Sequence, residues 1–114
     1  MAIPAAIAAL IERLNQELNE IEQEAIQGLN QARNKLSRTD NTLLIQLFAS
    51  LNNALLFVDI SRRQIQTTVD GISPTNVPLE AVQEAGEDLA TLLGKVLEGK
   101  ISVSRVITLI EELP

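Results

Sequence analysis

Hydrophobic residues recur along the first third of the chain at alternating steps of four and three. The series runs Ile7, Ile11, Leu14, Leu18, Ile21, Ala25, Gly28 or Leu29, Ala32 and Leu36. This spacing places the side chains on one face of an α-helix. Pro4 suits the first turn of a helix, because the N–H that proline lacks would have no partner there. We therefore predict a helix over residues 4–36.

A second apolar helix is predicted over residues 41–68, after the short polar stretch Ser37–Asn41. Thr39 or Asp40 can cap its first turn. Its apolar positions form a seam with a second row beside it: Leu44, Phe48, Leu51, Leu55, Val58, Ile65 and Val69, and then Leu43, Leu47, Ala54 and Phe57. An apolar surface this wide predicts that the first half of the helix is covered on more than one side.

The rest of the chain predicts two shorter helices. Gly71, Pro74 and Pro78 break the pattern and indicate a loop. An apolar seam then predicts a helix over residues 78–98, with Gly99 in the position after its end. Ser102 or Ser104 can cap a last helix over residues 103–113. No segment alternates with the period of a strand.

These elements predict a single all-α domain, residues 1–114, with a long antiparallel helical hairpin and two shorter helices, elongated and resembling a four-helix bundle. The short turn at residues 37–41 makes the first two helices antiparallel neighbours, with facing positions that sum to about 79 or 80. This register sets Phe48 opposite Gly28 and Ala32. It also brings Arg62 and Arg63 near Glu17 and Glu20.

The first predicted helix is too long for a spherical domain. Its 33 residues span about 50 Å, whereas a compact fold of this size is about 34 Å across. Three arrangements can resolve the difference: an elongated chain, a bent helix, or a stripe that is partly buried by another chain.

The composition excludes most of the side chains used in catalysis and metal binding. Hydrophobic residues make up 46% of the 114 residues, but the chain contains no His, Cys, Trp or Tyr. Thiolate and imidazole nucleophiles, disulfides and the usual zinc and haem ligands are therefore missing. The glycines are scattered singly, so no phosphate-binding loop is present. We expect a protein that is not an enzyme and that has no cofactor and no metal site.

Carboxylates are the only abundant reactive groups. They share helical faces in two clusters: Glu17, Glu20 and Glu24, and Glu80, Glu84, Glu87 and Asp88. Di-iron bundles combine such carboxylates with histidines, which this chain lacks. The pattern favours solvated acidic faces, with weak Mg²⁺ or Ca²⁺ binding as the alternative.

Basic residues offer a second functional reading. Arg33, Lys35 and Arg38 cluster at the predicted hairpin tip, and Arg105 lies in the last helix. They are the candidate contacts of a small nucleic-acid-associated regulatory protein. The net charge of −6 disfavours nucleic acid as a partner. The cations also suit the C-terminus of a helix.

Two asparagines, Asn52 and Asn53, interrupt the most apolar part of the second helix. They are either surface amides beside the seam or, for one of them, a buried residue that sets the register of an interface between helices.

The leading expectation is a non-enzymatic helical module for protein–protein interaction or structure, which associates with itself as a homodimer or with another protein. The candidate interface lies near the start of the first helix, at Ile3, Ile7, Leu10 and Leu14. No run approaches 18 apolar residues, so a membrane-spanning role is not expected. The lack of cysteine fits a cytoplasmic protein.

Overall fold

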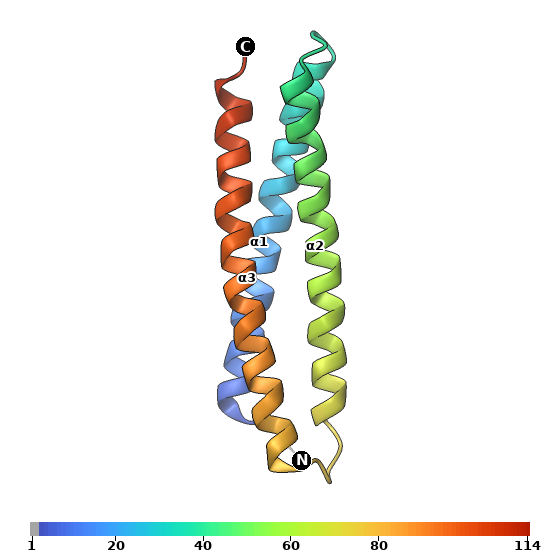
Figure 1. Cartoon of the computed structure of the whole chain (residues 1–114), viewed down its shortest axis with the longest axis vertical. Helices are drawn as coiled ribbons and strands as arrows, with labels where there is room; N and C mark the ends of the chain where they lie inside the picture. Colours follow the sequence, from blue (N-terminus) through green and yellow to red (C-terminus); the bar gives the residue numbers. More distant parts are fainter. Residues whose placement is uncertain (1–2) are drawn as a thin grey trace.

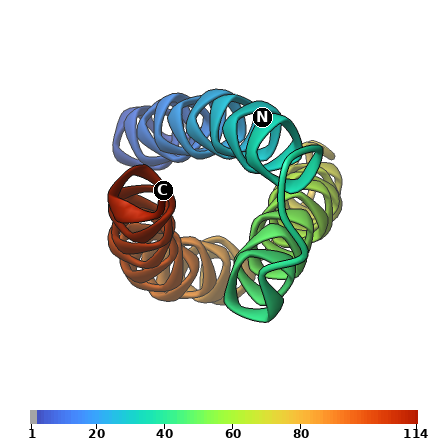
Figure 2. The same cartoon turned by 90° about the horizontal axis from the view of Figure 1, so that it is seen from above.

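Three long helices account for most of residues 3–114, the part of the chain that the computed structural model describes (Figure 1). They are α1 (Ala5–Leu36), α2 (Thr42–Ile72) and α3 (Leu79–Glu112). The chain runs up through α1, down through α2 and up again through α3, so that α1 and α3 are parallel. Viewed along the bundle, the helices surround a common axis (Figure 2). The all-α class is confirmed, but there are three helices between residues 3 and 114 rather than four.

The predicted break at Gly99 is wrong, because α3 continues through it without interruption. The buried residues Val96, Val103 and Ile110 follow at steps of seven, so the apolar seam stays in phase across the glycine. A glycine inside a helix costs only about 1 kcal/mol relative to alanine. Gly99 also has no positive φ and lies against Phe57, whose Cε2 would be 3.3 Å from an added Cβ. Packing therefore explains this glycine better than helix termination does.

The start of α2 also differs from the prediction. Asn41 caps the helix, rather than Thr39 or Asp40, and its Oδ1 accepts a hydrogen bond of 3.1 Å from the backbone N–H of Leu44. At the other end α2 continues to Ile72, past the expected end at residue 68. Ile72 is buried, so its packing supports the extra turn.

The molecule is a rod of 59 × 17 × 16 Å. Of the three arrangements that the length of the first helix allowed, the chain adopts the elongated one. Three helices of 31 to 34 residues lie side by side along the rod. The stripe of α1 is therefore buried by α2 and α3 of the same chain, and it needs no second chain to cover it.

Each helix contributes one stripe to a continuous core. The fully buried large side chains include Leu14, Leu18, Ile21, Leu44, Leu51, Val58, Leu89, Val96 and Ile110. The core also contains one polar residue among the described positions, Ser61, which is 1% exposed. Its Oγ has no hydrogen-bond partner.

The register of the hairpin is visible at Gly28. Leu51 Cδ1 lies 2.7 Å from the position that a Cβ would occupy on Gly28, and Ile107 Cγ1 lies 3.1 Å from it. Residues 28 and 51 fit the predicted sum of facing positions. The space at Gly28 receives Leu51 and Ile107, however, whereas Phe48 lies against Arg33.

Ion pairs between helices differ from the expected ones. Arg62 binds Glu22 at 2.6 Å and Asn19 at 2.8 Å, rather than Glu17 or Glu20. Lys100 of α3 instead binds those two glutamates, at 2.9 Å and 2.5 Å. The sequence reasoning missed this because it treated the hairpin alone, without the third helix beside α1.

Candidate protein-interaction surface

The residues predicted to form an interface on α1 lie inside the bundle. Ile7 and Leu14 are buried, and Leu14 is fully so. Ile7 lies 3.7 Å from the position of a Cβ on Gly86 of α3. Ile3 and Leu10 are partly buried and pack against the same core. This stripe contacts the chain's own helices and leaves little apolar surface for a partner.

Two of the four cations predicted to contact nucleic acid make contacts within the chain. Lys35 Nζ donates hydrogen bonds to the backbone carbonyls of Ile110 and Leu113, the latter at 2.5 Å, and so caps the end of α3. The guanidinium of Arg33 lies 5.8 Å from the centre of the Phe48 ring. Arg38 and Arg105 are exposed. Two of the four cations therefore have structural contacts of their own.

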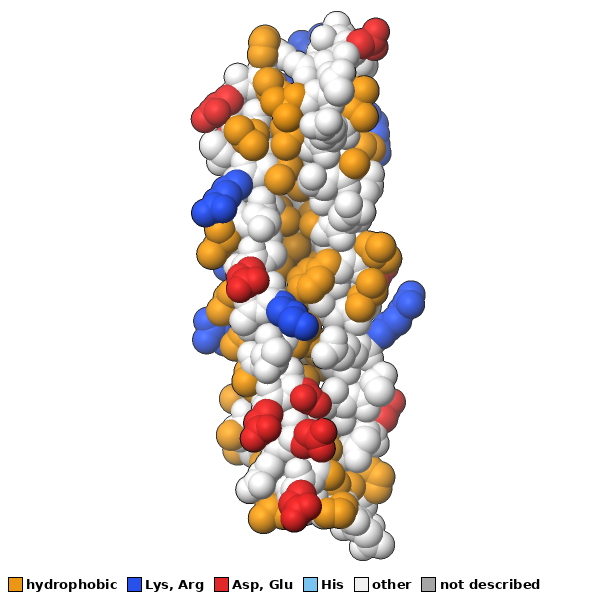
Figure 3. Space-filling model, in the orientation of Figure 1, with side chains coloured by type: hydrophobic (Ala, Val, Ile, Leu, Met, Phe, Trp, Pro, Cys, Tyr) orange, Lys and Arg blue, Asp and Glu red, His pale blue; other side chains and the backbone are white. Residues whose placement is uncertain are grey.

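The acidic cluster of α1 is occupied by contacts with α3. Glu17 and Glu20 bind Lys100, and Glu24 accepts a longer contact of 3.5 Å from Ser104 Oγ. The hydrogen bonds to Glu20 and Glu17 raise the pKa of Lys100 above its ordinary value. No group of three potential metal ligands occurs between residues 3 and 114. The second predicted acidic cluster, Glu80, Glu84, Glu87 and Asp88, lies in the first three turns of α3. Figure 3 shows a group of acidic side chains in the lower half of the molecule.

The surface of α2 that points away from the core is apolar. Ile45, Leu56 and Ile60 are 52%, 57% and 51% exposed, and Ala49 and Asn52 are exposed between them. Steps of four, three, four and four residues place all five on one face of the helix. We call Ile45, Ala49, Asn52, Leu56 and Ile60 the α2 outer face. Hydrophobic side chains are visible on this side of the molecule and along the α2–α3 seam (Figure 3).

A groove between α2 and α3 lies beside this face. It has a volume of about 320 Å³ and an apolar floor with Ser50, Asn53 and Ser102 among its lining residues. The other lining residues are Ile21, Leu51, Ala54, Phe57, Gly99, Val103 and Val106. The groove contains no ionisable side chain, so it offers apolar contact rather than acid–base chemistry.

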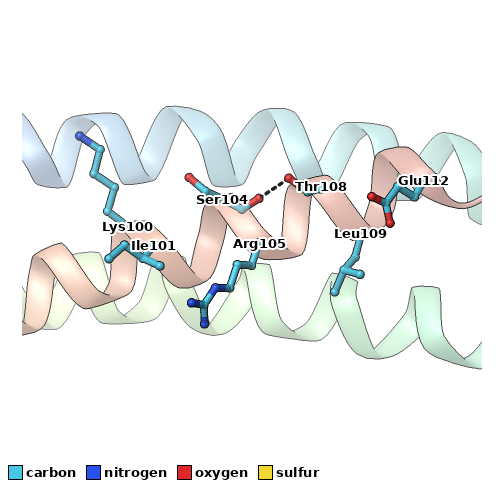
Figure 4. A pocket seen from close by; sticks show the side chains of 7 residues that line it. All are labelled: Lys100, Ile101, Ser104, Arg105, Thr108, Leu109 and Glu112. Carbon is cyan, nitrogen blue, oxygen red and sulfur yellow. Dashed lines mark hydrogen bonds between the residues drawn. The ribbon is translucent and has the colours of Figure 1, made fainter.

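A larger hollow, of about 600 Å³, is lined by α3 alone (Figure 4). Its residues are Lys100, Ile101, Ser104, Arg105, Thr108, Leu109 and Glu112. Ile101 and Leu109 are about half exposed, and Arg105 lies between them along the helix. Because one helix supplies every wall, the hollow is an open surface and does not enclose a ligand.

Helix α2 has two exposed asparagines on an otherwise apolar surface. Asn52 and Asn53 are both exposed in the single chain. Among the described helices, α2 is long and apolar enough to cross a membrane by length and composition, and 22% of its apolar 18-residue window is buried within the chain. Soluble helices can pass the same test of length and composition. The exposed apolar surface of α2 is therefore suited to contact with a partner protein or with lipid rather than with water.

From the sequence, the wide apolar surface of α2 was expected to be covered by other helices on more than one side. Ile45, Leu56 and Ile60 were not predicted to be exposed. One signal was available. No charged residue occurs from Asn41 to Val58, a stretch of five helical turns. A surface helix ordinarily carries charges on its solvent side. The missing charges mark this helix as the one whose outer side is unusual.

Comparisons with known protein families, with curated proteins and with solved structures find no match for this chain. Its function is therefore inferred from its own residues and their arrangement.

Proposed function

We propose that the chain is a non-enzymatic helical module that acts through protein–protein contact and associates with itself. The observation that carries this proposal is the α2 outer face, where three large apolar side chains are each more than half exposed on one side of a helix. Apolar patches of this kind are characteristic of interaction sites. The residue inventory supports the same proposal, since it lacks the histidine and cysteine of most catalytic sites.

The proposal moves the interacting surface from α1 to α2. The start of α1 was the expected interface, but its apolar side chains contribute to the core. The nucleic-acid alternative has weaker support, because Arg33 and Lys35 already contact Phe48 and the end of α3. A cytoplasmic location remains part of the proposal and rests on composition alone.

The mass of the full chain in solution tests the proposal. A face one helix wide belongs to the small end of protein interfaces, for which micromolar dissociation constants are typical. We expect light scattering over about 1–500 μM to show a mass that rises from one chain toward two. A mass of one chain over the whole series would contradict self-association. Binding of duplex DNA or RNA at low salt would favour the alternative function.

A further inference from the structure

The α2 outer face is self-complementary when two copies of α2 run in opposite directions. Pairing residues whose numbers sum to about 105 sets Ile45 against Ile60 and Ala49 against Leu56, with Asn52 and Asn53 at the centre. Every large side chain of the face then meets an apolar residue of the second copy. A two-fold symmetric interface requires this reciprocity, because the same patch serves both partners.

Parallel pairing of the same face fits less well. It would set Ala49 against Ala49, which leaves a gap, and Leu56 against Leu56. Antiparallel pairing sets the small Ala49 against the large Leu56 on both sides of the axis, so these layers can interdigitate. It also lets the amides of Asn52 and Asn53 hydrogen-bond across the axis, a use of asparagine that sets register in helical seams.

Charge also favours a second copy as the occupant. Each chain has a net charge of −6, which opposes association wherever acidic surfaces meet. The stretch Asn41–Val58 contains no charge, so two α2 outer faces can approach without repulsion at their centre. Antiparallel alignment places the acidic start of α3, residues 80–88, toward the partner's hairpin tip. That tip holds Arg33, Lys35 and Arg38 beside Asp40, Glu111 and Glu112, so it has no net formal charge and repels the acidic segment less than a second acidic segment would. Parallel alignment would place two acidic ends side by side (Figure 3).

We infer that the chain forms a two-fold symmetric antiparallel dimer through the α2 outer face, with the Asn52–Asn53 pair at the axis. This inference rests on the proposed self-association and specifies its surface, partner and direction. The partner is a second copy of the chain rather than a different protein or a lipid surface.

Glutamate substitutions test whether the dimer forms through the α2 outer face or through another surface of the molecule. Leu56→Glu puts a charge on the α2 outer face, and we expect it to weaken the dimer by about a hundredfold, because the charge would be buried against apolar groups. Ile26→Glu is the matched control, since Ile26 is a similarly exposed side chain on α1. It should leave the mass unchanged. Circular dichroism of both variants checks that the helices are retained.

Introduced cysteines test the direction of the helices, because the chain has no cysteine of its own. A disulfide requires Cβ atoms about 4 Å apart. Asn52→Cys should therefore cross-link with itself, and an equimolar mixture of Ile45→Cys and Ile60→Cys should cross-link on oxidation. Ile45→Cys alone should not, since its two copies would be about 22 Å apart along the antiparallel pair.

Each of the other possible outcomes would contradict one defined part of the proposed dimer. A dimer that survives Leu56→Glu would overturn the α2 surface while leaving self-association intact. Cross-linking of Ile45→Cys alone would overturn the antiparallel direction. A wild-type chain that stays monomeric and binds vesicles of neutral phosphatidylcholine, with binding lost in Leu56→Glu, would identify lipid as the occupant and overturn the dimer.

Discussion

Leu51 of α2 packs against Gly28 of α1 so closely that its Cδ1 lies 2.7 Å from the place of a Cβ. Alanine at position 28 would gain about 1 kcal/mol in helix propensity. It would also force Leu51 Cδ1 and Ile107 Cγ1 to shift within a packed core, where Leu51 is fully buried, at a cost of about 1–3 kcal/mol. We predict that Gly28→Ala lowers the free energy of unfolding, measured by urea denaturation.

The control for this substitution is Gly94→Ala in α3, because nothing lies within 4 Å of an added Cβ there. It should raise stability by about 0.5–1 kcal/mol through helix propensity alone. If both alanines stabilised the protein equally, the close approach of α1 and α2 at Gly28 would be contradicted.

Ser61 carries an unpaired hydroxyl in the core. A buried hydroxyl without a partner costs roughly 1–3 kcal/mol. We therefore predict that Ser61→Ala raises the free energy of unfolding by about 1 kcal/mol or more. Ser50→Ala is the comparison at an exposed position of the same helix, where the hydroxyl donates a hydrogen bond of 3.1 Å to the carbonyl of Gln46. Its small gain in helix propensity is offset by the loss of this exposed hydrogen bond, so we expect a change close to zero. Loss of stability in Ser61→Ala would mean that its hydroxyl is hydrogen-bonded in solution.

The Arg62–Glu22 pair gives a pH dependence. The hydrogen bond from Arg62 lowers the pKa of Glu22 below its ordinary value of 4.5, against a smaller opposing effect of burial. The pair therefore stabilises the fold above about pH 4.5, and this stability is lost as the pH falls through the lowered pKa. Both side chains are about one-third exposed, so we expect only about 0.5 kcal/mol.

The measurement is the difference in unfolding free energy between wild type and Arg62→Gln, taken at pH 7 and near pH 2.5. The difference should be present at neutral pH and shrink in acid. Arg63→Gln, at the exposed neighbouring position, should show no comparable change with pH. An Arg62→Gln deficit that persisted unchanged in acid would point to lost alkyl packing instead of the ion pair.

Lys35 secures the end of α3 through its bonds to backbone carbonyls. Lys35→Met keeps the alkyl chain but removes the charge and the donors, and should cost about 1–2 kcal/mol. Hydrogen exchange should become faster in the last turn of α3, around Thr108 to Glu112. Lys95→Met, at an exposed position of α3, is the control and should not change this exchange. Unchanged protection in Lys35→Met would contradict the cap.

The helical seams could be predicted from sequence because their periodicity is local. The steps of three and four in α1 follow from helix geometry, and one short turn sets the register of the hairpin near Gly28 and Leu51. Farther from the turn the register drifts, since Arg62 pairs with Glu22 rather than with Glu17 or Glu20. The continuity of α3 through Gly99 was missed, because a single glycine can mark either the end of a helix or a close contact inside one. The position of Phe57 against Gly99 decides between these readings, and it depends on a contact between two helices whose residues are more than 40 positions apart in the chain.

The candidate surface was also partly predictable from the sequence and partly decided by the tertiary structure. The sequence alone determined an all-α chain without His, Cys, Trp or Tyr and with a long uncharged stretch in its second helix. Only the tertiary structure decided which apolar residues are buried, because burial depends on how three helices share one axis. That arrangement encloses Ile7 and Leu14, engages Lys35 and Lys100 within the chain, and leaves Ile45, Leu56 and Ile60 outside. A helix buries the stripe that its neighbours can reach, and α2 has apolar residues on a side that its own chain does not cover.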